Sequence, residues 1–302
     1  SHRSVIALTG AERRSWLHSL SSQHVADQPD GSCTQNLSLD GQGRVEDHWV
    51  QTELGGVTYL DTEPWRGEPL LVYLRKMVFW ADVQLEEADL AVLSLLGPQL
   101  ADPGVLAVLG LAGLPAESTA VALPRGGFAR RLPSAPAQVE LDVLVPRADV
   151  ADWLARLNAA GVRRAGVWTY EAYRVAARRP RLGVDTDERT IPHEVGWIGP
   201  PGEGAVHLDK GCYRGQETVA RVHNLGKPPR MLVLLHLDGV TTDELPAAGS
   251  PVTTADGRTV GFVGTATHHY ELGPVALAVL KRSLPDDTQL RVGPTAAAID
   301  PD

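Results

Sequence analysis

The sequence predicts an α+β protein in which two regions with antiparallel sheets are followed by a small C-terminal β-barrel. Strand and helix patterns alternate through two rounds, and the strands often come as neighbouring pairs, which favours antiparallel pairing. After Arg221 the chain changes to short apolar runs separated by Gly, Pro and Asp turns, a spacing typical of a closed β domain. With 302 residues, 43% hydrophobic and 22% charged, the chain can build two or three domains with ordinary cores.

The first region is expected to hold four strands and two helices. The apolar segment Val5–Leu8 predicts a strand, and Thr9 and Glu12 then have the spacing of a capping box. A helix is therefore expected through Ser21, with Trp16 on its buried face. The other expected elements are strands at 33–39, 45–50 and 57–61, a turn at 40–43 and a helix at 68–77.

The middle of the chain contains the clearest helix pattern. Apolar residues at 150, 153, 154 and 157 recur on one helix face, and Gly161 closes the helix. A strand is expected at 139–145, ended by Pro146. The apolar run from 90 to 114 predicts a buried strand and then a short helix. A hairpin is expected between 79–85 and 90–96, around the polar turn 86–89.

The C-terminal part begins with a predicted linker at 223–230, which is rich in Gly and Pro. The barrel strands are expected at 231–237, 252–254, 259–266, 275–280 and 290–292. The predicted domains are residues 1–225, formed by two interleaved subdomains with splits near 50 and 140, and residues 226–302.

The octapeptide at 210–217, Lys-Gly-Cys-Tyr-Arg-Gly-Gln-Glu, is the most informative motif for function. Cys212 has a lysine two residues before it and an arginine two residues after it, and nearby cations favour the reactive thiolate. Gly211 and Gly215 allow close approach of the backbone to a ligand or another segment. The residues after Gly215 begin a helix, whose free amide groups favour an anion. The alternative is an inert cysteine that packs as a small hydrophobe.

Composition excludes several classes of function. The formal charge of −9 and the pI of about 5.6 argue against a broad nucleic-acid surface, and the arginines at 174, 178, 179 and 181 are interpreted as a solvated run. Cys33 and Cys212 cannot make a disulfide framework or a CxxC pair, so a cytoplasmic protein with no intrinsic metal is expected. His268 and His269 diverge on a strand, which favours surface or packing roles.

Neither a signal peptide nor a transmembrane helix is expected. The prediction is a monomer with no membrane partner and no direct nucleic-acid partner. The chain begins Ser1-His2-Arg3, without methionine, so we expect an upstream segment whose contribution to the site is not visible here.

The octapeptide and the following Thr218–Arg221 resemble the signature of the YgfZ family. These are folate-binding relatives of GcvT, the T-protein (aminomethyltransferase) of the glycine cleavage system. Further similar segments, in chain order, lie at 5–20, 43–45, 173–175, 183–185, 191–192, 194–196, 249–252, 260–263 and 276–278. The resemblance covers nearly the whole chain, and the cysteine motif is its most specific part.

The resemblance implies two ferredoxin-like antiparallel domains and the barrel, arranged around a central channel that holds tetrahydrofolate. It implies a role in the assembly or repair of iron–sulfur clusters in partner proteins, and through them in tRNA modification. The implied catalytic residues are Cys212, Lys210 and Asp47, with Lys210 and Arg214 stabilising the thiolate. The implied folate-binding residues are Tyr213, Gly215, Gln216, Glu217, Arg174, Arg221 and Trp197. Glu217 is expected to pair with Arg221 one helical turn away.

Two departures from the T-proteins affect the expected site. T-proteins carry a Leu-Arg-Leu-Glu-Ala-Gly stretch whose glutamate holds the pterin, but residues 173–178 here are Tyr-Arg-Val-Ala-Ala-Arg. The paired aspartates of T-proteins are replaced by Glu46 and Asp47, which face opposite sides of a strand. We assign Glu46 to the surface and keep Asp47 as a candidate. Trp168 and Trp197 could line a pterin cavity, with core packing as the default.

Three functions remain open from the sequence. The first is a folate-binding accessory protein for iron–sulfur proteins that depends on Cys212. The second is a true aminomethyltransferase that transfers a one-carbon unit to tetrahydrofolate, with Asp47 as its sequence support. The third is a scaffold that binds a partner protein without folate.

Overall fold

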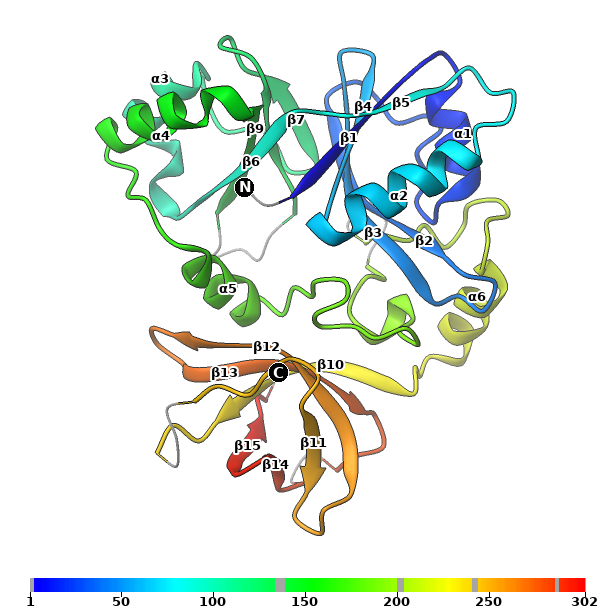
Figure 1. The fold of residues 1–302 in the computed structure, drawn as a ribbon, viewed down its shortest axis with the longest axis vertical. Coiled ribbons are helices and arrows are strands. Elements are labelled where there is room, and N and C mark those ends of the chain that lie inside the picture. The colour runs from blue at the N-terminus through cyan, green and yellow to red at the C-terminus, as the bar shows by residue number, and fades with distance from the viewer. Residues whose placement is uncertain (1–2, 134–138, 200–203, 241–243, 286–287, 302) are drawn as a thin grey trace. The chain divides into compact units, whose positions relative to one another are not determined.

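The computed structural model describes residues 3–133, 139–199, 204–240, 244–285 and 288–301. The chain forms two compact units (Figure 1). Unit 1 consists of residues 1–39, 46–164 and 199–214, and unit 2 consists of residues 40–45, 165–198 and 215–302. The cysteine motif is therefore divided, with Cys212 in unit 1 and the residues from Gly215 onward in unit 2.

Unit 1 is built on one nine-stranded sheet with the order β5-β1-β4-β3-β2-β7-β8-β9-β6. Its strands are β1 (Ser4–Thr9), β2 (Ser32–Leu39), β3 (Val45–Leu54), β4 (Val57–Thr62), β5 (Gln84–Glu87), β6 (Leu90–Leu96), β7 (Thr119–Ala122), β8 (Phe128–Arg131) and β9 (Glu140–Pro146). Its helices are α1 (Arg13–Leu20), α2 (Pro64–Lys76), α3 (Pro103–Leu109) and α4 (Val150–Ala159), with short 3₁₀ turns at Pro98–Ala101 and Arg147–Asp149.

Two hydrophobic cores hold the helices of unit 1 against the sheet. Helices α1 and α2 pack on β1, β3 and β4 through a cluster that includes Leu17, Leu70 and Trp49. Helices α3 and α4 pack on β6, β8 and β9 through a cluster that includes Leu109 and Trp153. Burial of a large apolar side chain stabilises by roughly 1.5–3 kcal/mol, so these repeated contacts explain why short helices persist here.

The strands of the two predicted α+β domains continue in this single sheet. The pair Ser32↔Thr119 joins β2 to β7, and so joins the two halves. A third cluster contains Val5 on β1, Val92 on β6 and Leu144 on β9, which shows that the sheet curls until its ends approach. The predicted α+β class and antiparallel pairing are confirmed.

The predicted hairpin between 79–85 and 90–96 is wrong. Strand β5 pairs with β1 in the register Ile6↔Glu87, whereas β6 pairs with β9 in the register Leu93↔Val143. The two strands therefore lie at opposite edges of the sheet order. The chain passes directly from one edge to the other, which is possible because the curled sheet brings β1 and β6 together.

The predicted capping box at α1 is also wrong. The hydroxyl of Thr9 lies 3.2 Å from Gln84 Oε1, and Glu12 Oε2 accepts a hydrogen bond of 2.7 Å from the Asp82 amide. Thr9 at the end of β1 thus contacts the first residue of β5, and Glu12 ties the start of α1 to the segment before β5. Strands β7 and β8 were not predicted, since each has only four residues.

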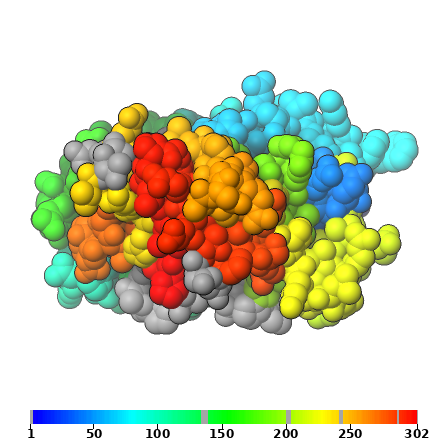
Figure 2. Space-filling view, turned by 90° about the horizontal axis from the view of Figure 1, so that it is seen from below, coloured from blue at the N-terminus to red at the C-terminus, as the bar shows by residue number. Residues whose placement is uncertain are grey.

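Unit 2 contains a closed six-stranded barrel with the order β10-β13-β12-β11-β14-β15, which confirms the predicted barrel. Its strands are β10 (Arg230–Leu237), β11 (Pro251–Thr254), β12 (Thr259–His269), β13 (Gly273–Lys281), β14 (Leu290–Val292) and β15 (Thr295–Ile299). Figure 2 shows red and orange residues, which belong to the C-terminal part of the chain, gathered on one face.

Two helices accompany the barrel in unit 2. Helix α5 (Val167–Ala176) was not predicted and packs on β12 and β13, and a 3₁₀ turn follows at Pro192–Glu194. Helix α6 (Gln216–Leu225) begins where the motif predicts it. It continues to Leu225 and β10 starts at Arg230, so the linker is shorter than the predicted 223–230. Among the described residues, no helix is both long and apolar enough to cross a membrane.

Candidate functional site

The two cysteines have opposite environments. Cys212 is exposed, whereas Cys33 on β2 is only 2% exposed. The Cys33 sulfur lies 3.6 Å from the Thr119 carbonyl oxygen and 3.5 Å from the Arg131 carbonyl oxygen. Burial raises the pKa of the Cys33 thiol to about 11. Cys33 is thus a packing residue, and Cys212 is the thiol that a reagent or partner can reach.

Lys210 lies buried beneath the cysteine loop, with 4% of its surface exposed. Its ammonium donates to the carbonyl oxygens of His18 at 2.6 Å, Ser21 at 2.7 Å and Gln23 at 3.1 Å. Burial lowers the pKa of Lys210 to about 8. The three hydrogens of the ammonium are therefore directed at backbone oxygens.

The other two residues beside Cys212 also have partners within unit 1. Arg214 is half-exposed and donates to Glu46 over 2.9 Å. Tyr213 is buried, its ring centroid lies 5.3 Å from the Lys210 ammonium, and burial raises the pKa of its phenol to about 12. Stabilisation of a Cys212 thiolate by Lys210 and Arg214 stays a prediction, because both cations are directed at oxygen acceptors.

Asp47 is buried on β3, with 3% of its surface exposed. Its carboxylate accepts a hydrogen bond of 2.7 Å from Arg66 on α2. Burial raises the pKa of Asp47 against the opposing effect of Arg66. Glu46 lies at the surface side, 38% exposed and paired with Arg214. The structure thus separates the two adjacent acids as strand geometry requires.

Gly215 is held by another segment of unit 2, the turn at 40–43. Its φ of +83° favours glycine, and a Cβ there would lie 2.6 Å from the Asp40 carbonyl oxygen and 2.8 Å from Gly43 Cα. Asp40 in turn accepts hydrogen bonds of 2.8 Å from the amides of Gln42 and Arg44. Gly215 therefore allows the start of α6 to lie against this turn.

Helix α6 carries three of the predicted folate-binding residues. Gln216 is its first residue and is partly buried, while Glu217 and Arg221 are exposed. The predicted ion pair between Glu217 and Arg221 is not among the ion pairs of the described residues, so that prediction is wrong. Both side chains extend into solvent from an exposed helix face, where such pairs contribute little.

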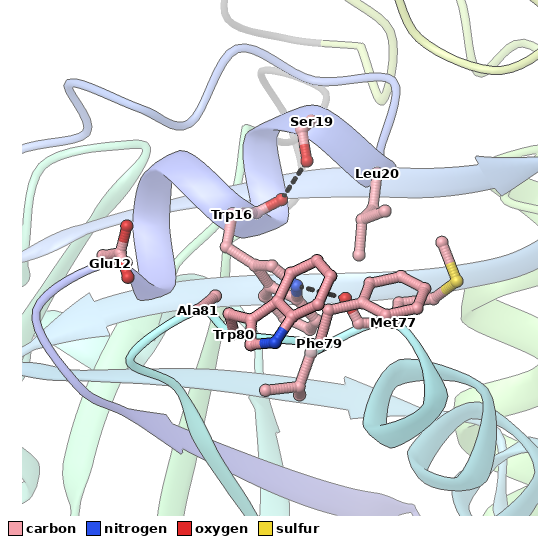
Figure 3. A pocket seen from close by; sticks show the side chains of 9 residues that line it. Glu12, Trp16, Ser19, Leu20, Met77, Phe79, Trp80 and Ala81 are labelled. Atoms are coloured by element: carbon pink, nitrogen blue, oxygen red, sulfur yellow. Dashed lines mark hydrogen bonds between the residues drawn. The ribbon is translucent and has the colours of Figure 1, made fainter.

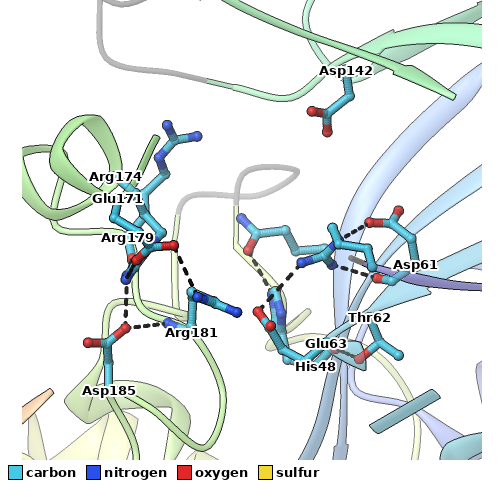
Figure 4. Close-up of polar contacts among 12 residues, drawn as sticks. His48, Asp61, Thr62, Glu63, Asp142, Glu171, Arg174, Arg179, Arg181 and Asp185 are labelled. Carbon is cyan, nitrogen blue, oxygen red and sulfur yellow. Dashed lines mark hydrogen bonds and ion pairs between the residues drawn. The ribbon is translucent and has the colours of Figure 1, made fainter. Parts of the chain in front are cut away.

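Arg174 on α5 is buried at the centre of an ion network in unit 2 (Figure 4). It donates to Glu171 Oε2, to Asp185 Oδ2 at 2.8 Å and to the Thr265 hydroxyl at 2.5 Å. Arg181 donates to the other oxygen of Glu171 at 3.0 Å. This part of the predicted solvated arginine run is therefore interior, and that interpretation was wrong.

Asp185 explains why this network exists. Strand β12 has a register shift between Val263 and Ala266, which leaves the Thr265 amide outside the ladder. Asp185 Oδ1 accepts that amide at 2.6 Å. A Cβ on Gly264 would lie 2.3 Å from the same oxygen. Sequence reasoning missed Glu171 and Asp185, although Glu171 stands three residues before Arg174 and so on the same helix face.

Trp197 is buried, with 3% of its surface exposed, and its amide donates 3.1 Å to the Pro192 carbonyl oxygen. Beside it in sequence, Glu194 is held by Arg230 of β10 at 2.8 Å. Arg230 also donates to Asp187 at 2.7 Å and 3.0 Å. The segment before the cysteine motif is thus fixed to the barrel within unit 2.

A pocket of unit 1 lies elsewhere, between α1 and residues 77–81 (Figure 3). It has a volume of about 460 Å³ and is lined by Glu12, Trp16, Ser19, Leu20, Met77, Val78, Phe79, Trp80 and Ala81. None of the predicted site residues lines it. Among the described residues, no group of three or more His, Cys, Asp or Glu side chains is placed to hold a metal ion.

Known proteins resemble this chain over most of its length, although no family model matches it. An aminomethyltransferase of Stenotrophomonas maltophilia (strain R551-3) is 28% identical over 287 residues, which cover 88% of this chain and 72% of that protein. The tRNA-modifying protein YgfZ of Vibrio atlanticus (strain LGP32) is 23% identical over 300 residues, covering 96% and 85%. YgfZ of Aliivibrio fischeri (strain MJ11) is 36% identical over 90 residues, covering 29% of this chain and 27% of that protein.

A solved structure extends this likeness to the fold. The glycine cleavage system aminomethyltransferase T of Bartonella henselae superposes with a TM-score of 0.82, at 20% identity, over 100% of this chain and 83% of that one. At this identity the match concerns the fold alone. Together with the two kinds of sequence relative, it confirms the resemblance read from the motif: the chain is a relative of the YgfZ proteins and of the glycine-cleavage aminomethyltransferases, and it has the aminomethyltransferase fold.

Proposed function

We propose that the chain is a tetrahydrofolate-binding accessory protein for the assembly or repair of iron–sulfur clusters in partner proteins, and indirectly for tRNA modification. The observation that carries the proposal is the exposed Cys212 in the Lys-Gly-Cys-Tyr-Arg-Gly-Gln-Glu motif. A cysteine thiolate is the usual ligand of cluster iron and the nucleophile in thiol exchange. An accessible Cys212 can therefore engage a cluster or a partner sulfur.

The residues proposed to bind folate differ in how well they can contact it. The Arg174 guanidinium is already bound to Glu171 and Asp185, and Trp197 is buried, so these two can support a binding surface but offer little to a ligand directly. Glu217 and Arg221 on α6 are exposed and could contact one. Support for folate itself comes from the likeness to the YgfZ and T-protein family, whose pterin glutamate has no counterpart at 176–177.

The test of the cysteine is complementation of a strain that lacks its own counterpart protein. Cys212→Ala should leave the fold intact, because the side chain is exposed, yet fail to restore the activity of cluster-dependent enzymes. Cys33→Ala is the matched control, since it removes the other thiol and should restore activity. Full restoration by Cys212→Ala would remove this residue from the mechanism.

Folate binding is tested by titrating tetrahydrofolate while recording tryptophan fluorescence or heat. We expect saturable binding that weakens in Arg221→Gln and Glu217→Gln. The absence of binding at millimolar folate would favour the folate-free scaffold. This titration therefore separates the scaffold from both folate-dependent functions.

The alternative is a true aminomethyltransferase, favoured by the 28% identity to the Stenotrophomonas enzyme. Its candidate acid, Asp47, is buried and bound to Arg66, a placement typical of a structural ion pair. A coupled assay with a lipoylated aminomethyl carrier protein tests it. Turnover that disappears in Asp47→Asn would overturn the accessory role in favour of this enzyme.

A further inference from the structure

We propose that Lys210 is a positioning residue for Cys212, fixing the cysteine loop to the end of α1 rather than activating the thiol by its charge. This inference rests on the proposed role of Cys212, and it changes what the lysine of the motif is for. Three kinds of observation in unit 1 support it. They are the hydrogen bonds of the ammonium, the further hydrogen bonds between residues 18–23 and residues 204–210, and the charges around Lys210.

The ammonium closes the C-terminal end of α1. The carbonyl oxygens at the end of a helix have no partner within the helix, and they carry a partial negative charge that a cation stabilises. His18 is in the last turn of α1, and Ser21 and Gln23 follow the helix. Their three oxygens take the three hydrogens of Lys210 at 2.6, 2.7 and 3.1 Å. Three backbone oxygens at this helix end therefore hold the ammonium.

Further hydrogen bonds run beside the ammonium between the same two segments. The Ser22 hydroxyl donates to the Ala205 carbonyl oxygen at 2.7 Å, and the Gln23 side-chain amide donates to the Gly204 carbonyl oxygen at 2.7 Å. The His207 amide donates to the Ser22 carbonyl oxygen at 3.0 Å. Residues 204–210 are therefore held along residues 18–23, and Cys212 stands two residues beyond the last contact.

The contacts between residues 18–23 and residues 204–210 form a clamp, and Lys210 supplies its positive charge. Three imidazoles gather here: the ring centroids of His18 and His24 are 4.7 Å apart, and those of His24 and His207 are 5.3 Å apart. Burial and the nearby Lys210 charge lower the pKa of His18, and Asp27 opposes them. His18 thus tends to stay neutral, and the lysine supplies the charge that the helix end requires.

The experiment measures alkylation of Cys212 by iodoacetamide as a function of pH, in a Cys33→Ala background so that Cys212 is the one thiol present. The profile yields two quantities, the midpoint of thiol ionisation and the rate constant per thiolate. If Lys210 positions the loop, Lys210→Met changes the rate constant per thiolate by about tenfold and leaves the midpoint in place. Lys210→Arg, which keeps the charge and several donors, should keep most of the wild-type rate.

Ser19→Ala is the matched control, because it removes a hydrogen bond of 2.7 Å to the Trp16 carbonyl oxygen inside α1 and leaves the clamp and the ammonium in place. It should leave both quantities unchanged. A midpoint raised by about one pH unit in Lys210→Met would show that the lysine activates the thiol instead, and a profile that does not move at all would assign it to folding stability alone. Both results overturn the proposal. Neither depends on folate or a partner, so this test can fail while the proposed function stands.

Discussion

At the residue scale, the two glycines that flank Cys212 differ in what holds them. Gly215 combines a φ of +83° with backbone atoms that a Cβ would meet at 2.6 Å and 2.8 Å. Gly211 has no positive φ, and a Cβ there would meet nothing within 4 Å. A glycine is therefore required by a tight backbone contact at position 215, whereas no such contact requires it at position 211.

We therefore expect Gly215→Ala to lower the free energy of unfolding by about 1–3 kcal/mol, because it adds backbone strain and displaces the turn at 40–43. Gly211→Ala is the matched control, because Gly211 directly precedes the same cysteine, and it should change the free energy of unfolding by less than about 0.5 kcal/mol. Urea denaturation of the two variants measures both values. Equal losses of stability would contradict the role assigned to the turn contact.

At the scale of elements, Arg130 connects several strands of the unit 1 sheet. From β8 it pairs with Asp61 on β4 and with Asp142 on β9 at 3.0 Å, and it lies 3.3 Å from the Thr52 hydroxyl on β3. Arg130 and Asp61 are each 1% exposed, and Asp61 is also held by Arg3 at 2.6 Å. These pairs reinforce a sheet whose two halves meet at the pair Ser32↔Thr119.

Arg130→Met should destabilise unit 1 by about 3–5 kcal/mol, because it leaves buried carboxylates short of a partner. The neighbouring Arg131→Met is the control. Its ion pair with Glu117 has side chains 24% and 46% exposed, so its loss should cost at most about 1 kcal/mol. Thermal or urea unfolding of the two variants compares them directly. A similar loss in both would mean that the buried network adds nothing beyond a surface pair.

The elements that the sequence predicts well are those whose own residues carry the pattern. Helix α4 follows from apolar residues at 150, 153, 154 and 157, of which Trp153 and Leu157 are buried. Five of the six barrel strands follow from short apolar runs between turns, whereas β15 was not predicted. Strand β5 could not be assigned its partner, since its pairing with β1 depends on how the whole sheet curls.

The candidate site also contains features that depend on local sequence and features that depend on distant segments. The motif predicts a helix after Gly215, because this depends on neighbours in sequence. It left open whether Cys212 is reactive or packs as a small hydrophobe, and the structure exposes this side chain. The partners of Lys210 lie 187–192 residues away, and composition alone places arginines such as Arg130 and Arg174 at the surface. Burial of these charges depends on acceptors from distant segments, which no local pattern reveals.

At the scale of the whole molecule, two partly buried histidines should make stability depend on pH. Burial lowers the pKa of His48 in unit 1 and of His193 in unit 2 to about 4. Below pH 6.5 the unfolded chain takes up protons at these positions while the folded chain does not, so acid favours unfolding.

We expect stability to fall as the pH drops from about 6.5 to about 4, by at most about 3 kcal/mol for each histidine. His48→Gln should flatten part of this slope, and the exposed His268→Gln should leave it unchanged. Urea unfolding at a series of pH values measures the slope. Below this window the lowered pKa values of Asp61 and Asp187 add their own loss of stability. A slope unaffected by His48→Gln would show that the ring does not titrate in this range.

The difference in exposure between Cys212 and the buried Cys33 has a practical consequence. Maleimide chemistry on the unmodified protein should attach one dye or spin probe per molecule, at Cys212, without any engineered cysteine. A metal cluster or a partner bound at Cys212 would then slow labelling by the dye. The labelling rate would therefore report how much of Cys212 is occupied.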